Sequence, residues 1–185
     1  MATNAVSHSV YGESPGEEKS ETHTLCVLVD NEPGVLARVI GLFSGRGYNI
    51  DSLTVAETEK SRHLSLITLV CTSTPLVIEQ IKNQLGRLVP VRRVADLTLD
   101  GPHVERELAL VKVSGTGEKR VEALRTADIF RARVVDSTVE SFVFEITGDS
   151  AKVNAFIDLM QPLGLVDVSR TGVAAIGRGK TAIEA

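Results

Sequence analysis

The sequence is poor in aromatic residues and in cysteine. It has no tryptophan, two tyrosines and five phenylalanines, so few side chains are available on which nucleic-acid bases could stack. Its two cysteines, Cys26 and Cys71, each stand alone in an apolar run. That spacing excludes the paired cysteines of a zinc site or of a disulfide framework. We therefore predict two small buried side chains and no metal site.

Long apolar runs are also missing. No segment approaches the roughly 20 apolar residues that span a bilayer, and the N-terminus lacks the apolar core of a signal peptide. We therefore expect a cytoplasmic protein without membrane contact.

Charge is low overall and unevenly distributed. The formal net charge is −4 over 185 residues, and residues 1–22 hold four glutamates against one lysine. The other 163 residues thus carry 19 Lys and Arg against 20 Asp and Glu. A near-neutral body lacks the basic surface that nucleic acids or anionic membranes require. Residues 1–22 also have few large apolar side chains, which predicts a disordered acidic extension.

From residue 23 onward, hydrophobic periodicity predicts regular structure. Strands are expected at 25–29, 50–57, 63–72 and 91–99, with amphipathic helices beginning near Pro33 and Pro75. This order, β-α-β-β-α-β, is that of a ferredoxin-like unit with one antiparallel sheet and both helices on one face. We assign it to residues 23–99.

Gly101 and Pro102 mark a boundary, after which the same order is repeated in residues 100–185. Strands are expected at 108–113, 133–138, 142–147 and 165–168, and the helices run through 121–130 and 150–164. The charged run at 103–107 is expected to be a solvated rim or a partner contact, and the tail from 172 to be loosely structured at its end. The predicted fold is thus α+β, with two tandem βαββαβ units whose uncovered edges favour pairing with a second copy.

The run DNEPGVLAR at 30–38 follows a strand and opens a helix. A glycine at such a junction, Gly34, leaves backbone N–H groups uncovered at the positive helix end, which suits a small carboxylate. The segment GYNI at 47–50 begins the next strand, expected beside the first, and offers a polar and an apolar side chain. The pattern indicates an amino-acid sensor; the alternative is that Asn31 only caps the helix and Gly34 only eases a turn.

No catalytic group is evident. The four histidines share no helical face at i, i+4 spacing, and no Ser/His/Asp grouping stands out. The glycines at 115 and 117 lack the third glycine of a dinucleotide fingerprint, because Arg120 occupies its place. The tail at 177–181 (GRGKT) lacks the first glycine of a phosphate loop, because Ala174 occupies that position. We predict a non-catalytic chain.

Several stretches resemble one known family. Residues 31–44 (NEPGVLARVIGLFS) and 46–55 (RGYNIDSLTV) closely resemble the amino-acid-binding ACT domain in the regulatory (small) subunit of acetolactate synthase, also called acetohydroxyacid synthase. The C-terminal domain of that family is similar at 103–108 (HVEREL), 129–132 (IFRA) and 169–172 (SRTG). The resemblance covers roughly residues 23–180.

The resemblance implies a regulatory role without catalysis. In this family the large catalytic subunit carries thiamine diphosphate, Mg and FAD and condenses two pyruvates, or pyruvate with 2-oxobutyrate. The small subunit raises that activity and confers feedback inhibition, usually by valine, with sites between two ACT domains of a homodimer. The alternative is a free-standing ACT sensor acting on another enzyme or regulator. By position, the valine contacts implied for this chain are Asn31, Gly34, Val35, Leu36, Asn49 and Ile50.

The chain departs from some relatives at two loop positions. It has Pro33 in the loop and Ala37 where a hydroxyl residue can occur. These departures leave the affinity and the preference among branched-chain amino acids open.

Overall fold

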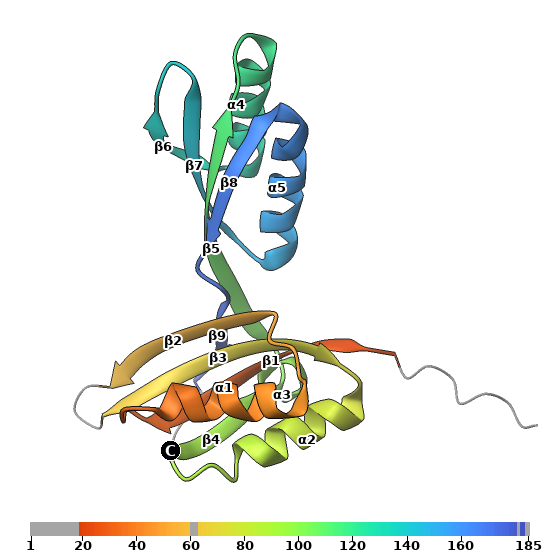
Figure 1. Cartoon of the computed structure of the whole chain (residues 1–185), viewed down its shortest axis with the longest axis vertical. Coiled ribbons are helices and arrows are strands. Elements are labelled where there is room, and N and C mark those ends of the chain that lie inside the picture. Colours follow the sequence, from red (N-terminus) through yellow and green to blue (C-terminus); the bar gives the residue numbers. More distant parts are fainter. Residues whose placement is uncertain (1–18, 60–62, 181, 184–185) are drawn as a thin grey trace, which may run out of the picture.

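The computed structural model describes residues 19–59, 63–180 and 182–183, so the predicted acidic extension lies outside the described residues up to residue 18. The described chain forms two lobes, each an antiparallel sheet with helices on one face (Figure 1). This arrangement confirms the predicted α+β class with two βαββαβ units. Within the described ranges, no helix has both the length and the apolar character needed to cross a membrane.

The first lobe begins at Glu21, two residues before the predicted boundary. Its strands are β1 (Glu21–Asp30), β2 (Ser52–Glu59), β3 (Leu64–Ser73) and β4 (Val91–Asp96), and its helices are α1 (Val35–Arg46) and α2 (Pro75–Leu85). The strand order is β2-β3-β1-β4. The expectation that β2 lies beside β1 is therefore wrong. β3 pairs antiparallel with both β1 and β2 and so lies between them, as in a ferredoxin-like unit.

The central strand β1 is buried on both faces. Leu25, Val27 and Val29 are at most 1% exposed and pack against the two helices. The helices contribute to this core the residues Val35, Val39, Phe43, Ile78, Ile81 and Leu85. Alternate side chains such as Cys26 and Leu28 point to the other face, the open face, and are buried there as well. Something besides the helices must therefore cover the first sheet.

The second lobe repeats this topology. Its strands are β5 (His103–Ser114), β6 (Arg133–Ser137), β7 (Ser141–Gly148) and β8 (Leu165–Arg170), and its helices are α4 (Glu118–Phe130) and α5 (Ser150–Gly164). The order β6-β7-β5-β8 is that of the first sheet. Three phenylalanines, Phe142, Phe144 and Phe156, form the centre of its core.

The connection between the lobes covers the open face of the first sheet. The expected strand at 91–99 stops at Asp96, because residues 97–100 form the short helix α3 (Leu97–Asp100), whose Asp100 carboxylate accepts from the Asp96 amide at 3.1 Å. The run at 103–107 is not a solvated rim, since it begins β5 and Glu107 is 5% exposed. The tail holds a strand that was not predicted, because β9 (Ala174–Gly177) pairs with the start of β5.

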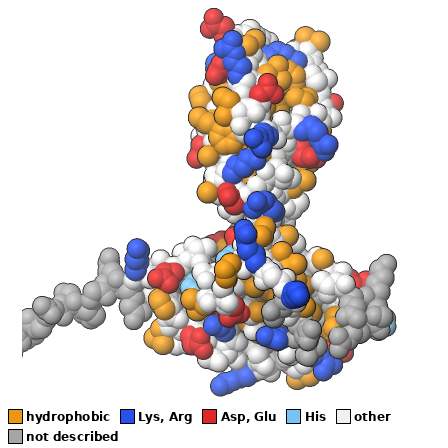
Figure 2. Space-filling view, turned by 180° about the vertical axis from the view of Figure 1, so that it is seen from behind, with side chains coloured by type: hydrophobic (Ala, Val, Ile, Leu, Met, Phe, Trp, Pro, Cys, Tyr) orange, Lys and Arg blue, Asp and Glu red, His pale blue; other side chains and the backbone are white. Residues whose placement is uncertain are grey.

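Side chains from the tail complete this cover. Ala175 and Ile183 pack against a small cluster of Cys26, Ala95 and Leu97 on the open face. The two lobes meet at a narrow neck (Figure 2). The chain thus crosses from one lobe to the other and returns to the first lobe at its end.

Candidate functional site

The loop after β1 leads directly into the N-terminus of α1. The Asn31 amide donates to the carbonyl of His63 at 2.7 Å, which fixes the loop to the start of β3. Gly34 is the N-cap residue of α1 and has a φ of 84°, in the left-handed region that favours glycine. Among the described residues, and apart from the neighbours of Gly34 in the chain, no atom lies within 4 Å of the position that a Cβ would take at Gly34. The helix start is therefore open to a small ligand.

The backbone donors at this helix start are largely free. The Val35 amide donates to the Glu32 carbonyl at 3.3 Å, and the first helical bond runs from the Arg38 amide to the Gly34 carbonyl at 3.1 Å. In the described part of the chain, the amides of Leu36 and Ala37 between them have no acceptor. No acidic side chain lies in the first turn of the helix. Free amides at a positive helix end form an anion site of the size of a carboxylate.

The other predicted side chains around this loop differ in exposure. Asn31 is exposed and does not cap the helix, because Gly34 is the N-cap residue and no side chain bonds there. Val35 is 4% exposed and belongs to the core, whereas Leu36 is 37% exposed. Leu36 is thus the apolar side chain of this loop that a ligand could contact.

The second predicted segment lies in a polar cluster before β2. The Asn49 amide group donates to one carboxylate oxygen of Asp51 at 2.6 Å, and the Thr72 hydroxyl donates to the other at 2.7 Å. The Thr22 hydroxyl lies 2.9 Å from that of Thr72. Ile50 is half-buried against the core of the first lobe. These contacts hold the start of β2 in one place.

The structure does not bring the two segments together within one chain. Asn31 bonds to His63 at the start of β3, whereas the Asp51 amide donates to Val70 near its end, at 2.8 Å. The 12 residues of α1 separate Gly34 from Asn49, a length of about 18 Å. An amino acid is much shorter than this. The two predicted parts of the site, here called half-sites, therefore lie apart within one chain, one at each end of α1.

A cavity between the lobes was not foreseen from the sequence. It encloses about 840 Å³ between the open face of the first sheet and the neck. Its lining includes Ser52, Glu105, Arg170 and Gly172. Because these residues come from both units, no local pattern could have identified the cavity. A second cavity of about 720 Å³ lies at the other end of the open face, over Leu28.

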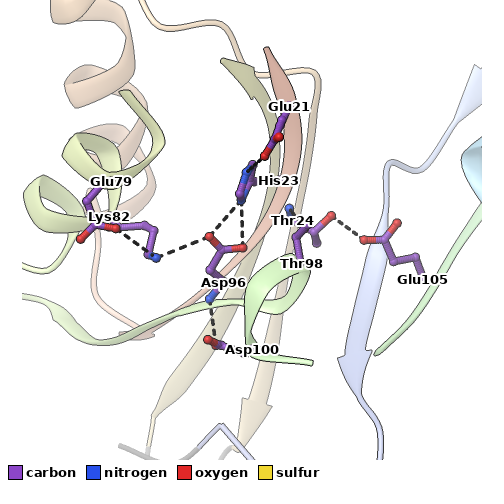
Figure 3. A network of polar contacts seen from close by, with 9 residues as sticks. All are labelled: Glu21, His23, Thr24, Glu79, Lys82, Asp96, Thr98, Asp100 and Glu105. Atoms are coloured by element: carbon purple, nitrogen blue, oxygen red, sulfur yellow. Dashed lines mark hydrogen bonds and ion pairs between the residues drawn. The ribbon is translucent and has the colours of Figure 1, made fainter. Parts of the chain in front are cut away.

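A polar network lies around the buried Asp96, and beside it Thr24, Thr98 and Glu105 also line the first cavity (Figure 3). Asp96 is 1% exposed and accepts from His23 Nδ1 at 3.0 Å, while Lys82 Nζ lies 3.5 Å from the same carboxylate. Partial burial lowers the pKa of Lys82, but Glu79 and Asp96 raise it further than burial lowers it, so the pKa is raised overall. Thr24 on β1 donates to Glu105 on β5. This network joins α2, β4 and the connection between the lobes.

Within residues 19–59, 63–180 and 182–183, no three His, Cys, Asp or Glu side chains are grouped so that they could hold a metal ion. The glycine-rich tail is not followed by a helix up to Lys180, and Thr181 of the predicted phosphate-loop fragment lies outside the described residues.

Comparisons with known proteins agree with this architecture. A family model described as "AHAS small subunit-like ACT domain" matches residues 25–93, and one described as "Small subunit of acetolactate synthase" matches residues 106–179. The two matches together cover both lobes.

Curated relatives match over most of their length. The chain is 49% identical over 157 residues to the probable acetolactate synthase small subunit of Archaeoglobus fulgidus, covering 85% of this chain and 97% of the relative. It is 45% identical to the acetolactate synthase isozyme 3 small subunit of Escherichia coli, covering 84% and 94%. A crystal structure of the acetolactate synthase small subunit from Thermotoga maritima matches with a TM-score of 0.77 at 38% identity, over 87% of this chain and 99% of that one. The chain therefore belongs to the family of acetolactate synthase small subunits, the regulatory, non-catalytic subunits of this enzyme of branched-chain amino-acid biosynthesis.

Proposed function

We propose that this chain activates an acetolactate synthase large subunit and confers feedback inhibition by valine. The cofactors of the reaction, thiamine diphosphate, Mg and FAD, belong to the large subunit in this proposal. Residues 23–99 bind the effector and dimerise, residues 100–185 transmit or supply activation, and the complex works in the cytoplasm. The observation that carries the proposal is the uncovered start of α1, with free Leu36 and Ala37 amides and open space at Gly34.

The carboxylate of valine binds at this helix start. Among the described residues, the Val35 amide already has an acceptor, whereas the amides of Gly34, Leu36 and Ala37 have none. A carboxylate at such a position gains charge-assisted hydrogen bonds and a favourable interaction with the helix dipole. The exposed Leu36 side chain provides apolar contact for the branched side chain.

The second half-site comes from another copy of the chain. β2 is an edge strand of its sheet, so its free backbone groups can pair with β2 of a second copy. In an antiparallel pair related by a twofold axis, the start of one β2 lies beside the end of the other. Asn49 and Ile50 precede the start of β2, and the Asn31–Gly34 loop lies near its end, beside His63. Such a dimer completes two equivalent sites.

Calorimetric titration with L-valine tests this site. Gly34→Asp puts a carboxylate where that of valine binds, so we expect affinity to fall at least about 100-fold through the lost charge-assisted bonds and the added repulsion. Gly34→Ala is the matched control: it has the same backbone strain without the charge, and its Cβ meets no atom within 4 Å. Its affinity should stay within about tenfold of that of the wild type. Valine affinity that is unchanged in Gly34→Asp excludes the site.

A mixture of two variants tests whether the site is shared. Gly34→Asp and Asn49→Ala each lose binding alone, but a heterodimer of the two contains one site with neither substitution. Random exchange makes half of the dimers mixed, so the mixture should recover about one quarter of the wild-type binding capacity. If each site lies within one chain, the mixture binds no valine at all.

A further inference from the structure

We infer that the contact between the first half of β2 and residues 171–173 transmits valine binding to the second lobe. Ser52 and Gly172 are the positioning residues of this contact, which we call the β2 junction. The inference rests on the proposed valine site and deepens it, because it names the route by which occupancy of that site acts on the rest of the subunit.

On the first lobe, the junction is continuous with the second half-site. β2 begins at Ser52, three residues after Asn49. Asp51 lies between them, and its carboxylate accepts from both Asn49 and Thr72. A ligand that binds Asn49 must therefore displace Asp51 or weaken its hydrogen bond to Asn49, and Asp51 directly precedes Ser52.

On the side of the second lobe, the junction consists of residues 171–173, which fit closely against β2. The Val173 amide donates to Ser52 Oγ at 2.8 Å, and Val173 is 4% exposed. Gly172 has a φ of 84°, and a Cβ there would lie 2.9 Å from Ser52 Oγ and 2.9 Å from Thr54 Oγ1. Only glycine satisfies both the backbone conformation and the space. The segment cannot shift along β2 without losing this fit.

The same segment is fixed to the sheet of the second lobe. The Thr171 amide donates to the Leu108 carbonyl at 3.0 Å, and the Leu108 amide donates to the Thr171 hydroxyl at 3.1 Å. One residue earlier, Arg170 pairs with the buried carboxylate of Glu107. Movement of the start of β2 is therefore passed to β5 and β8 through three consecutive residues.

The lobes have other contacts that do not involve the half-sites. Thr24 on β1 bonds to Glu105 on β5, and Ala175 packs near Cys26. These contacts join the second lobe and the tail to β1, a central strand of the first sheet. A ligand changes an equilibrium only through contacts that differ between two states, and β2 is the strand that the half-site adjoins.

The test separates valine binding from its consequence. In the complex with the large subunit, we expect Ser52→Ala and Gly172→Ala to bind valine within about threefold of the wild-type affinity. The ratio of activity without valine to activity at saturating valine should fall at least about threefold in each variant, within the usual range of allosteric coupling. Thr24→Val is the matched control, since it removes a contact between the lobes away from β2 and should leave the ratio unchanged.

Hydrogen exchange gives a readout independent of activity. In the wild type, valine should change the exchange rate of the amides of residues 171–174, and in Ser52→Ala it should not. Ser52→Ala is the milder of the two substitutions, so the test holds if Gly172→Ala fails to fold.

The possible failures can be told apart. If the wild-type complex does not bind valine, the proposed function is wrong and this inference falls with it. If valine binds and inhibits Ser52→Ala as it does the wild type, or if Ser52→Ala loses valine binding, the junction is not the route and only the inference is overturned.

Discussion

The Glu107–Arg170 pair should contribute much more to stability than a second ion pair in the same sheet. The Glu107 side chain is 3% exposed and that of Arg170 is 34% exposed. Arg133 Nη2 and Glu145 Oε1, paired across β6 and β7 at 2.7 Å, have side chains 72% and 25% exposed. Arg170 also donates to both oxygens of Glu107, whereas Arg133 donates to one oxygen of Glu145, so burial and bidentate geometry both favour the first pair.

The coupling energies expected for the two ion pairs follow from these differences. A hydrogen bond to a charged group contributes about 1.5–3 kcal/mol, and breaking a fully buried pair costs about 3–5 kcal/mol. Because one third of the Arg170 side chain meets solvent, we expect a coupling energy of about 2 kcal/mol for Glu107–Arg170. For the exposed Arg133–Glu145 pair we expect less than about 1 kcal/mol.

Two double-mutant cycles measure these energies. The variants are Glu107→Gln with Arg170→Met, and Glu145→Gln with Arg133→Met, and urea unfolding is followed by far-UV circular dichroism. Protein concentration is held constant, since dimerisation would add to the apparent stability. Equal coupling energies in the two cycles, or a value below about 0.5 kcal/mol for the buried pair, would refute the reasoning.

Two further predictions concern single positions. Burial raises the pKa of the Cys71 thiol from 9.0 to about 11, with smaller contributions from Asp51 and Asp96. Because the thiol ionises more readily in the unfolded chain, the free energy of unfolding should fall by up to about 2.7 kcal/mol as the pH rises from 9 through 11. Urea unfolding of Cys71→Ala should lack this part of the pH dependence, and a profile identical to that of the wild type would contradict the argument. At Gly164, with a φ of 106°, a Cβ would lie 2.0 Å from the Ser114 carbonyl oxygen, so Gly164→Ala should cost at least about 2 kcal/mol in thermal unfolding. Gly45→Ala, in α1 with no atom within 4 Å, should instead stabilise by about 0.5–1 kcal/mol, and equal effects at both glycines would contradict the argument.

The sequence predicted most elements because their signals are local. Alternation at Leu25, Val27 and Val29, and helical spacing at Val35, Val39 and Phe43, follow directly from burial on one face. The open helix start at Gly34 was also predicted, since a glycine before an apolar helix pattern is a local feature.

What was missed depends on partners far away in the chain. The place of β2 is an exception, because β2 pairs with β3, the next strand in the sequence, and the error there hid the distance between Asn31 and Asn49. The strand β9 has only four residues, and its partner in β5 lies about 70 residues earlier. So short a segment has no strand signal of its own and forms because β5 offers an unpaired edge.

The return of the chain end to the first lobe has a consequence for synthesis in the cell. Residues 21–96 can form the first sheet and its helices, but Ala175 and Ile183 are needed to cover Cys26, Ala95 and Leu97. At about 5–20 residues per second, a ribosome needs on the order of 4–16 s to make the roughly 80 residues between these points. Throughout that interval the nascent chain lacks the part of this cover that Ala175 and Ile183 provide. Chaperones that hold nascent chains should therefore bind this subunit between the completion of its first lobe and the synthesis of Ile183.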